Sequence, residues 1–137
     1  MAFNGYLIKI GGTDFPLKYI EHKTYKVTPN QRQEKKANRN AEGELIRTTL
    51  PHTPVKIEFE TLPGIKNSAV EEINSLIRSN FTVPLERKLS INYYDPEENT
   101  YKTADVYMPD TEYPIMRIDT EHNVVYYDKI RYAFIGY

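Results

Sequence analysis

The chain has 137 residues, of which 39% are hydrophobic and 27% are charged, a length and composition that predict one domain with a single core. Its 18 Lys and Arg residues balance 19 Asp and Glu residues, and the formal net charge of −1 lacks the basic excess of a duplex-binding module. Cysteine is absent, which excludes a disulfide framework, a thiolate zinc site and a cysteine nucleophile.

The beginning of the chain has no basic region followed by an apolar run, which is the pattern of a signal peptide. No apolar stretch approaches the ~20 residues that a helix needs to span a bilayer. We therefore expect a protein that is made in a cytoplasm and does not insert into a membrane.

Three short strands are predicted in the first third of the chain. Each is a run of β-prone residues, and the first ends at Gly11 and Gly12, which supply a turn. The predicted strands are residues 6–10, 19–27 and 45–50.

Residues 28–44 separate the second and third of these strands and contain no large apolar side chain. Because such a segment cannot contribute to a core, it predicts a long, mobile, charged loop within the single domain 1–137. Two interpretations stay open: a solvated linker, or an arm that becomes ordered on a neighbouring subunit. The candidate interface residues of this loop are Arg32, Lys35, Lys36, Arg39 and Glu42.

The middle of the chain predicts a strand followed by the only convincing helix. Val55, Ile57 and Phe59 alternate with charged residues, as in a strand with one buried face. Ser68 and Glu71 have the spacing of a capping box and predict the start of the helix. The apolar residues of the helix lie on one stripe, so we expect it to cover a sheet. This stripe consists of Val70, Ile73, Leu76, Ile77 and Phe81.

The last third predicts two antiparallel hairpins. The first pairs residues 89–93 with residues 101–108, and the second pairs residues 113–119 with residues 124–137. No parallel βαβ series is visible. The sequence therefore predicts a mostly β fold, an antiparallel β-sandwich or barrel with one packed α-helix.

The polar residues show no catalytic or metal-binding pattern. His22, His52 and His122 have no histidine or carboxylate at i+3 or i+4, so each is predicted to be a surface or loop histidine. No glycine-rich phosphate loop is present, and no serine lies in a nucleophile elbow. The sequence predicts a protein that is not an enzyme and needs no cofactor or metal.

Tyrosine is abundant, with 12 residues against 5 Phe and no Trp. Its ring can lie on a core while its hydroxyl reaches water, and it is favoured at protein interfaces. Bases could also stack on these rings, but acidic residues interleave them, which favours sheet packing and subunit contact. The candidate interface residues on the sheet are Tyr94, Tyr101 and Tyr107.

Four segments carry a resemblance to a known family. Residues 93–107 (Tyr-Tyr-Asp-Pro-Glu-Glu-Asn-Thr-Tyr-Lys-Thr-Ala-Asp-Val-Tyr) resemble the strand–turn–strand of small prophage tail proteins of Gram-positive bacteria, most of them of unassigned function. Also similar to that family are the early strand ending in Gly11-Gly12, the polar loop that reaches Asn-Ala-Glu-Gly-Glu-Leu-Ile-Arg at residues 40–47, and the aromatic closing strand. The likeness covers nearly the whole chain.

The resemblance implies a tail-tube-like fold, which tube subunits, distal tail proteins and tail-terminator relatives share. It implies subunits that join into a ring, hexameric in the family, with a long loop that reaches a neighbour. Other tail or baseplate proteins would be partners, and DNA would only pass through the lumen as cargo. The protein would be made in the cytoplasm of a bacterial host and assembled into a virion or phage-like tail.

Two other functions compete with the ring subunit. The first is a small monomeric protein-binding module that presents the 28–44 loop to a soluble partner. The second is a nucleic-acid-binding β-barrel, which the neutral charge balance disfavours.

Overall fold

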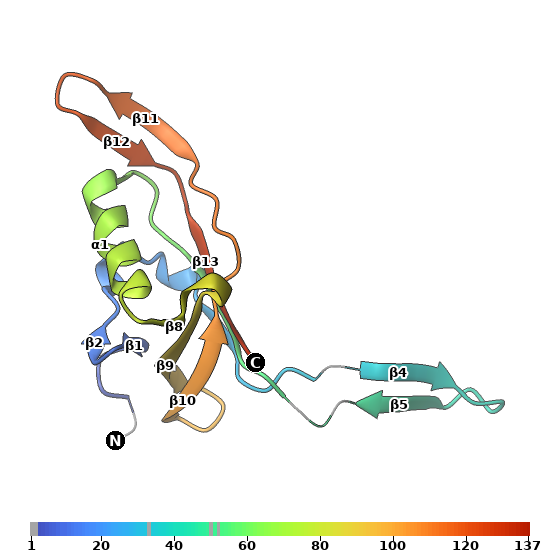
Figure 1. The fold of residues 1–137 in the computed structure, drawn as a ribbon. Coiled ribbons are helices and arrows are strands. Elements are labelled where there is room, and N and C mark those ends of the chain that lie inside the picture. Colours follow the sequence, from blue (N-terminus) through green and yellow to red (C-terminus); the bar gives the residue numbers. More distant parts are fainter. Residues whose placement is uncertain (1–2, 33, 50, 52) are drawn as a thin grey trace.

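The computed structural model describes residues 3–32, 34–49, 51 and 53–137 (Figure 1). Its strands pair antiparallel throughout. In chain order the elements are β1 (Ile8–Ile10), β2 (Thr13–Asp14), 3-10 helices η1 (Leu17–Tyr19) and η2 (His22–Thr24), β3 (Lys26–Thr28), β4 (Glu34–Arg39), β5 (Leu45–Thr49), β6 (Lys56–Glu60), β7 (Ile65–Lys66), α1 (Asn67–Arg78), β8 (Phe81–Val83), 3-10 helix η3 (Pro84–Glu86), β9 (Lys88–Asp95), β10 (Thr100–Tyr107), β11 (Ile115–Asp119), β12 (Val124–Tyr127) and β13 (Arg131–Gly136).

Within the described residues, these strands form three sheets. The main sheet has the order β2-β1-β9-β10-β13-β6-β3, with β8 also paired to β9. A three-stranded sheet has the order β11-β12-β7, and β4 pairs only with β5. The prediction of a mostly β fold with antiparallel sheets and one packed helix is confirmed, with more strands than the sequence predicted.

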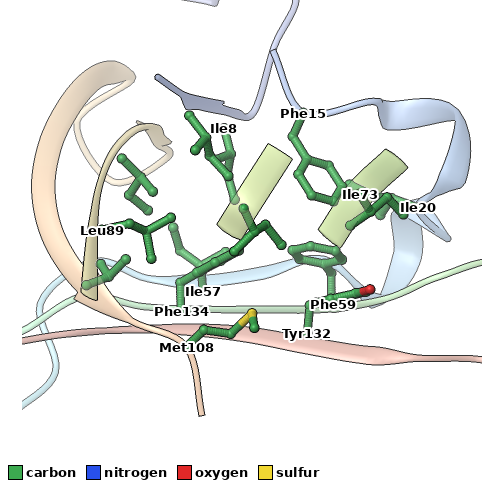
Figure 2. Close-up of a cluster of buried hydrophobic side chains, with 14 of the residues drawn as sticks. Ile8, Phe15, Ile20, Ile57, Phe59, Ile73, Leu89, Met108, Tyr132 and Phe134 are labelled. Carbon is green, nitrogen blue, oxygen red and sulfur yellow. The ribbon is translucent and has the colours of Figure 1, made fainter. Parts of the chain in front are cut away.

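The core lies between one face of the main sheet and helix α1 (Figure 2). Alternate residues of the central strands face inward, as the period of two in a strand requires, so that Ile57 and Phe59 of β6 and Tyr132 and Phe134 of β13 are buried. From the helix, Ile73 enters the same cluster. Val70 and Ile77 are buried with it and Leu76 packs against the cluster, so the stripe covers the sheet as expected, but Phe81 lies beyond the helix, in β8.

Helix α1 starts differently from the prediction. Lys66 is its N-cap, with no side-chain cap hydrogen bond, and Ser68 lies inside the first turn. The reason is that Lys66 also pairs with Tyr126 in the three-stranded sheet, so the chain enters the helix directly from β7. The capping-box prediction was wrong. With 12 residues, α1 is also short, and no helix in the described ranges is long and apolar enough to cross a membrane.

The strand predicted at residues 19–27 is also wrong except at its end. Tyr19 ends η1, residues 22–24 form η2, and Ile20 makes only an isolated bridge to Thr61, so only Lys26 and Val27 of the predicted strand lie in one, β3. The Thr24 hydroxyl donates a hydrogen bond to the Glu21 carbonyl at 2.6 Å, a local bond that competes with strand pairing. The final predicted strand, 124–137, is likewise divided into β12 and β13, which belong to different sheets.

Tyr25 provides a test of the packing beneath this segment. Its ring stacks on Phe59 with centroids 5.6 Å apart, and among the described residues its buried hydroxyl has no hydrogen-bond partner. Burial raises the pKa of this phenol above its ordinary value. Since an unsatisfied buried hydroxyl costs about 1–3 kcal/mol, Tyr25→Phe should leave the free energy of unfolding unchanged or raise it.

Tyr101→Phe is the matched control for this substitution. The Tyr101 hydroxyl donates to the Tyr6 carbonyl at 2.7 Å and accepts from the Asn4 amide at 2.8 Å. Removing this hydroxyl should lower the free energy of unfolding, measured in urea, by about 0.5–1.5 kcal/mol for each hydrogen bond lost. If Tyr25→Phe destabilised the protein as much as Tyr101→Phe, the hydroxyl of Tyr25 would have a partner in solution.

Candidate assembly surfaces

The most prominent feature of the structure is a hairpin that extends away from the body (Figure 1). Its first strand, β4, lies inside the segment predicted as a mobile loop at 28–44, so residues 34–39 form a strand that the sequence did not predict. Its second strand, β5, lies where the sequence predicted a strand at residues 45–50. We call residues 32–53 the arm. Its tip is closed by local turn chemistry, which needs no core.

At the tip of the arm, the Asn40 side chain accepts hydrogen bonds from the main-chain amides of Glu42 and Glu44 at 3.0 and 2.9 Å. Gly43 has a φ of +86°, a conformation that suits glycine. Asparagine and glycine at these places are the usual residues of a tight turn. The turn therefore holds the two strands together without burying apolar side chains.

The predicted loop residues are spread along the arm. Arg32 is exposed near its base, where its Nη1 donates to the Asn30 carbonyl at 3.3 Å. Arg39 is exposed at the end of β4 and donates to the Gly43 carbonyl at 2.9 Å, and Glu42 is exposed in the turn. Lys35 and Lys36 lie on β4, but their side chains are outside the described part of the structure, as are all of Leu50 and His52.

The base of the arm is fixed to the body by several contacts. The Gln31 amide donates to the Pro54 carbonyl at 3.0 Å, which brings the two ends of the arm together. The Asn30 side chain donates to Glu97 Oε2 at 3.2 Å, in the turn between β9 and β10. The arm thus starts from an anchored pair of residues.

The predicted tyrosines do not form one surface. Tyr94 and Tyr101 are cross-strand partners on β9 and β10, with ring centroids 5.6 Å apart. Tyr6 stacks on Tyr101 at 4.4 Å, so these half-buried rings pack against the N-terminal segment. Tyr107 lies at the other end of β10, where its ring contacts Tyr137 at 5.5 Å.

A charged cluster holds the turn between β9 and β10. The side chain of Asp95 is buried, and Lys102 Nζ lies 2.9 Å from Asp95 Oδ2 and 2.9 Å from Glu98 Oε2. Burial pushes the pKa of Asp95 up, but hydrogen bonds from Lys102 and from the Glu97 amide outweigh it, so the pKa lies below the ordinary value. The contacts of Lys102 with the carboxylates of Asp95 and Glu98 raise the pKa of Lys102.

This cluster predicts a loss of stability in acid. Because the pKa of Asp95 is lower in the folded state, its contribution is present above the unfolded pKa of about 3.9 and is lost as the pH falls through the folded value. Urea unfolding of the wild-type chain should therefore give a decreasing free energy below about pH 4, and Asp95→Asn should weaken that decrease. Asp14→Asn, at an exposed ion pair with Lys9, is the control and should keep the wild-type slope. Equal slopes for all three proteins would contradict the assignment.

Sequence reasoning missed the second protruding surface, strand β11. Three large apolar side chains of this strand are exposed: Ile115 at 58%, Met116 at 51% and Ile118 at 60%. The sequence did carry a signal: apolar residues stand at odd and at even positions of this run, so neither face of the strand is wholly polar. The strand lies in a hairpin beyond α1, at the opposite end of the molecule from the arm (Figure 1).

The described residues also form a hollow of about 210 Å³ beside the end of α1. Arg87 at its edge pairs with Asp110 at 2.8 Å. None of the described residues that line it is a carboxylate, histidine or serine, so the hollow offers no acid–base pair. The lining residues are Asn74, Ile77, Arg78, Phe81, Arg87, Met108, Thr111 and Tyr113. Elsewhere in the described ranges, no group of three or more His, Asp or Glu residues could hold a metal ion.

Comparisons with known proteins give one result. No curated protein and no solved structure matches the chain. One family matches over residues 1–137, and its description is Family of unknown function (DUF6711). Since the match spans the whole chain, the protein belongs to this family.

Proposed function

We propose that this protein is a non-enzymatic structural subunit of a phage, prophage or phage-derived tail, and that it forms a ring in the tube or at the junction of tube and baseplate. It is made in the cytoplasm of the bacterial host and needs no cofactor. Its partners are copies of itself, in the hexamer that the sequence resemblance implies, and other tail or baseplate proteins. DNA passes through the lumen of the ring as cargo, and the protein does not recognise it.

The observation that carries this proposal is the arm. A two-stranded hairpin is marginally stable by itself in water, and β4 and β5 pair only with each other in the described structure. An extension of this kind can gain stability from contact with another chain. It projects well beyond the body, which gives it the reach to meet a neighbour (Figure 1).

The exposed strand β11 and the sequence resemblance support the same proposal. Exposed apolar surface on a sheet edge is typical of an interface between subunits. A contact between two different surfaces of one chain is heterologous, and such contacts close into rings when the rotation allows it. The resemblance to small prophage tail proteins supports a tail as the assembly.

A monomeric binding module remains the alternative, because the arm could equally present its charged residues to an unrelated partner. Light scattering after size exclusion, over a series of protein concentrations, separates the two. The ring subunit should reach a fixed multiple of the 16.1 kDa chain mass as the concentration rises. A binding module should keep the monomer mass at every concentration, and that result would exclude the ring.

A further inference from the structure

Strand β11 has an outer edge that nothing in the described structure covers. It is the last strand in the order β11-β12-β7, so its main-chain groups pair with β12 on one side only. Helix α1 packs on β7 and β12 of the same sheet. The helix leaves β11 uncovered at Ile115 and Ile118, which are both more than half exposed.

Soluble proteins usually protect such an edge with charges, proline or a bulge. In β11 the protection is partial: a register shift lies between Ile115 and Arg117, and Arg117 is the only basic residue of the strand. The guanidinium of Arg117 lies over the ring of Tyr126, 4.1 Å from its centroid, and so does not shield the isoleucines on the other face. The edge is therefore suited to receive a further strand.

The arm of a second copy fits this edge better than another β11 does. The arm carries five basic residues against three acidic ones, whereas residues 112–128, which contain the β11–β12 hairpin, carry four acidic residues and one basic residue. The two surfaces are thus of opposite net charge, and each copy presents one of each. Two β11 hairpins would instead bring together surfaces of the same negative sign.

The geometry also requires two copies. The arm and the β11–β12 hairpin project from opposite ends of the molecule, so they cannot meet within one chain (Figure 1). Both strands of the arm have a free edge in the described structure, because β4 and β5 form a two-stranded sheet. Each copy can therefore donate a strand at one end and accept one at the other.

We infer that β11 is the docking site for the β4–β5 arm of a second copy of this chain, which adds to the sheet as a strand and covers Ile115 and Ile118. The main-chain hydrogen bonds of the added strand supply the contact, and the opposite charges select its partner. Because donor and acceptor differ, the contact is heterologous and propagates around a ring. This inference rests on the proposed self-assembly and specifies the two surfaces that make it.

Photo-crosslinking at position 118 tests the inference. Ile118→p-benzoylphenylalanine is mixed with an equal amount of isotopically labelled wild-type chain, irradiated at a concentration at which the protein assembles, and analysed by mass spectrometry after digestion. The label separates crosslinks between copies from those within one copy. We expect inter-copy crosslinks to residues 34–49. Leu85→p-benzoylphenylalanine is the matched control, since Leu85 is 97% exposed but lies on η3, and it should not crosslink to the arm.

Crosslinks from position 118 to β11 of another copy, to a different surface, or to nothing in an assembled sample would each overturn the inference. A second variant checks the energetic role of the edge. Ile118→Lys should lower the assembled fraction at least tenfold at fixed concentration, while Leu85→Lys should not change it. If Ile118→Lys assembled like the wild type, the docking site would be refuted while self-assembly itself stood. If the wild-type chain never assembled, the proposed function would fail first.

Discussion

A chain in which the arm, residues 32–53, is replaced by Asn-Gly should fold normally and lose the ability to assemble. The Gln31 amide and the Pro54 carbonyl are 3.0 Å apart, so the two ends can be joined by a two-residue hairpin turn, for which Asn-Gly is a favoured sequence. The core lies elsewhere, between the main sheet and α1, and the deletion removes none of it. Circular dichroism and thermal melting should therefore change little.

The loss of assembly should be complete because every contact around a ring uses the same arm. Each exposed ion pair contributes only ~0–1 kcal/mol, so the added strand and the covered apolar side chains must supply the rest. Light scattering would then give the monomer mass at concentrations where the wild-type chain is assembled. An arm-deleted chain that assembled normally would make the arm a passive connection and would move the interface to other surfaces.

The largest effect on stability should come from Phe59. This buried ring lies at the centre of an aromatic group, with centroids 5.2 Å from Phe15, 5.7 Å from Tyr132 and 6.4 Å from Phe134 (Figure 2). Truncating it removes contacts with both the sheet and the N-terminal segment, and neither can move far enough to fill the space. Phe59→Ala should reduce the free energy of unfolding by about 3–5 kcal/mol.

Urea unfolding followed by circular dichroism measures this change. Leu85→Ala is the control, because the Leu85 side chain is 97% exposed and its removal should alter stability by no more than about 0.5 kcal/mol. A Phe59→Ala chain within 1 kcal/mol of the wild type, by contrast, would place this ring outside the cooperative core.

The parts of the fold that were predictable from the sequence are those with a clear period. Ile57 and Phe59 in β6, and Tyr132 and Phe134 in β13, alternate with charged or small residues and are buried as that alternation requires. Asn99 and Asn123 lie in the turns of the two C-terminal hairpins, β9–β10 and β11–β12, and both have positive φ values. The alternation and the turn residues are local features, which is why the sequence shows them.

The parts that were not predictable depend on tertiary contacts. The start of α1 is fixed by the pairing of Lys66 with Tyr126, residues 60 positions apart in sequence. The division of the last strand follows from the bonds between Thr61 and Ile130, in which the Ile130 amide donates to the Thr61 hydroxyl and the Thr61 amide to the Ile130 carbonyl. Neither contact leaves a periodic trace in the sequence.

The candidate surfaces divide in the same way. The charged composition of residues 28–44 indicated a segment outside the core, and the turn at Asn40 to Gly43 could have indicated a hairpin. For Ile118 the sequence signal, apolar residues on both faces of the run, was not enough to predict exposure, because an apolar residue in a strand is usually buried and only the sheet order shows that β11 is an edge. The abundance of tyrosine predicted that these rings lie at an interface. Only the fold shows that they contact other rings of the same chain.

Negative-stain electron microscopy of the purified chain at high concentration tests the central claim most directly. If the protein is a ring-forming tail subunit, class averages should show annular particles of one rotational symmetry with an open centre, wide enough for DNA to pass. The arm-deleted chain, imaged in parallel, should show none. Fields of monomers only, or open filaments without closed rings, from the wild-type chain would contradict the account.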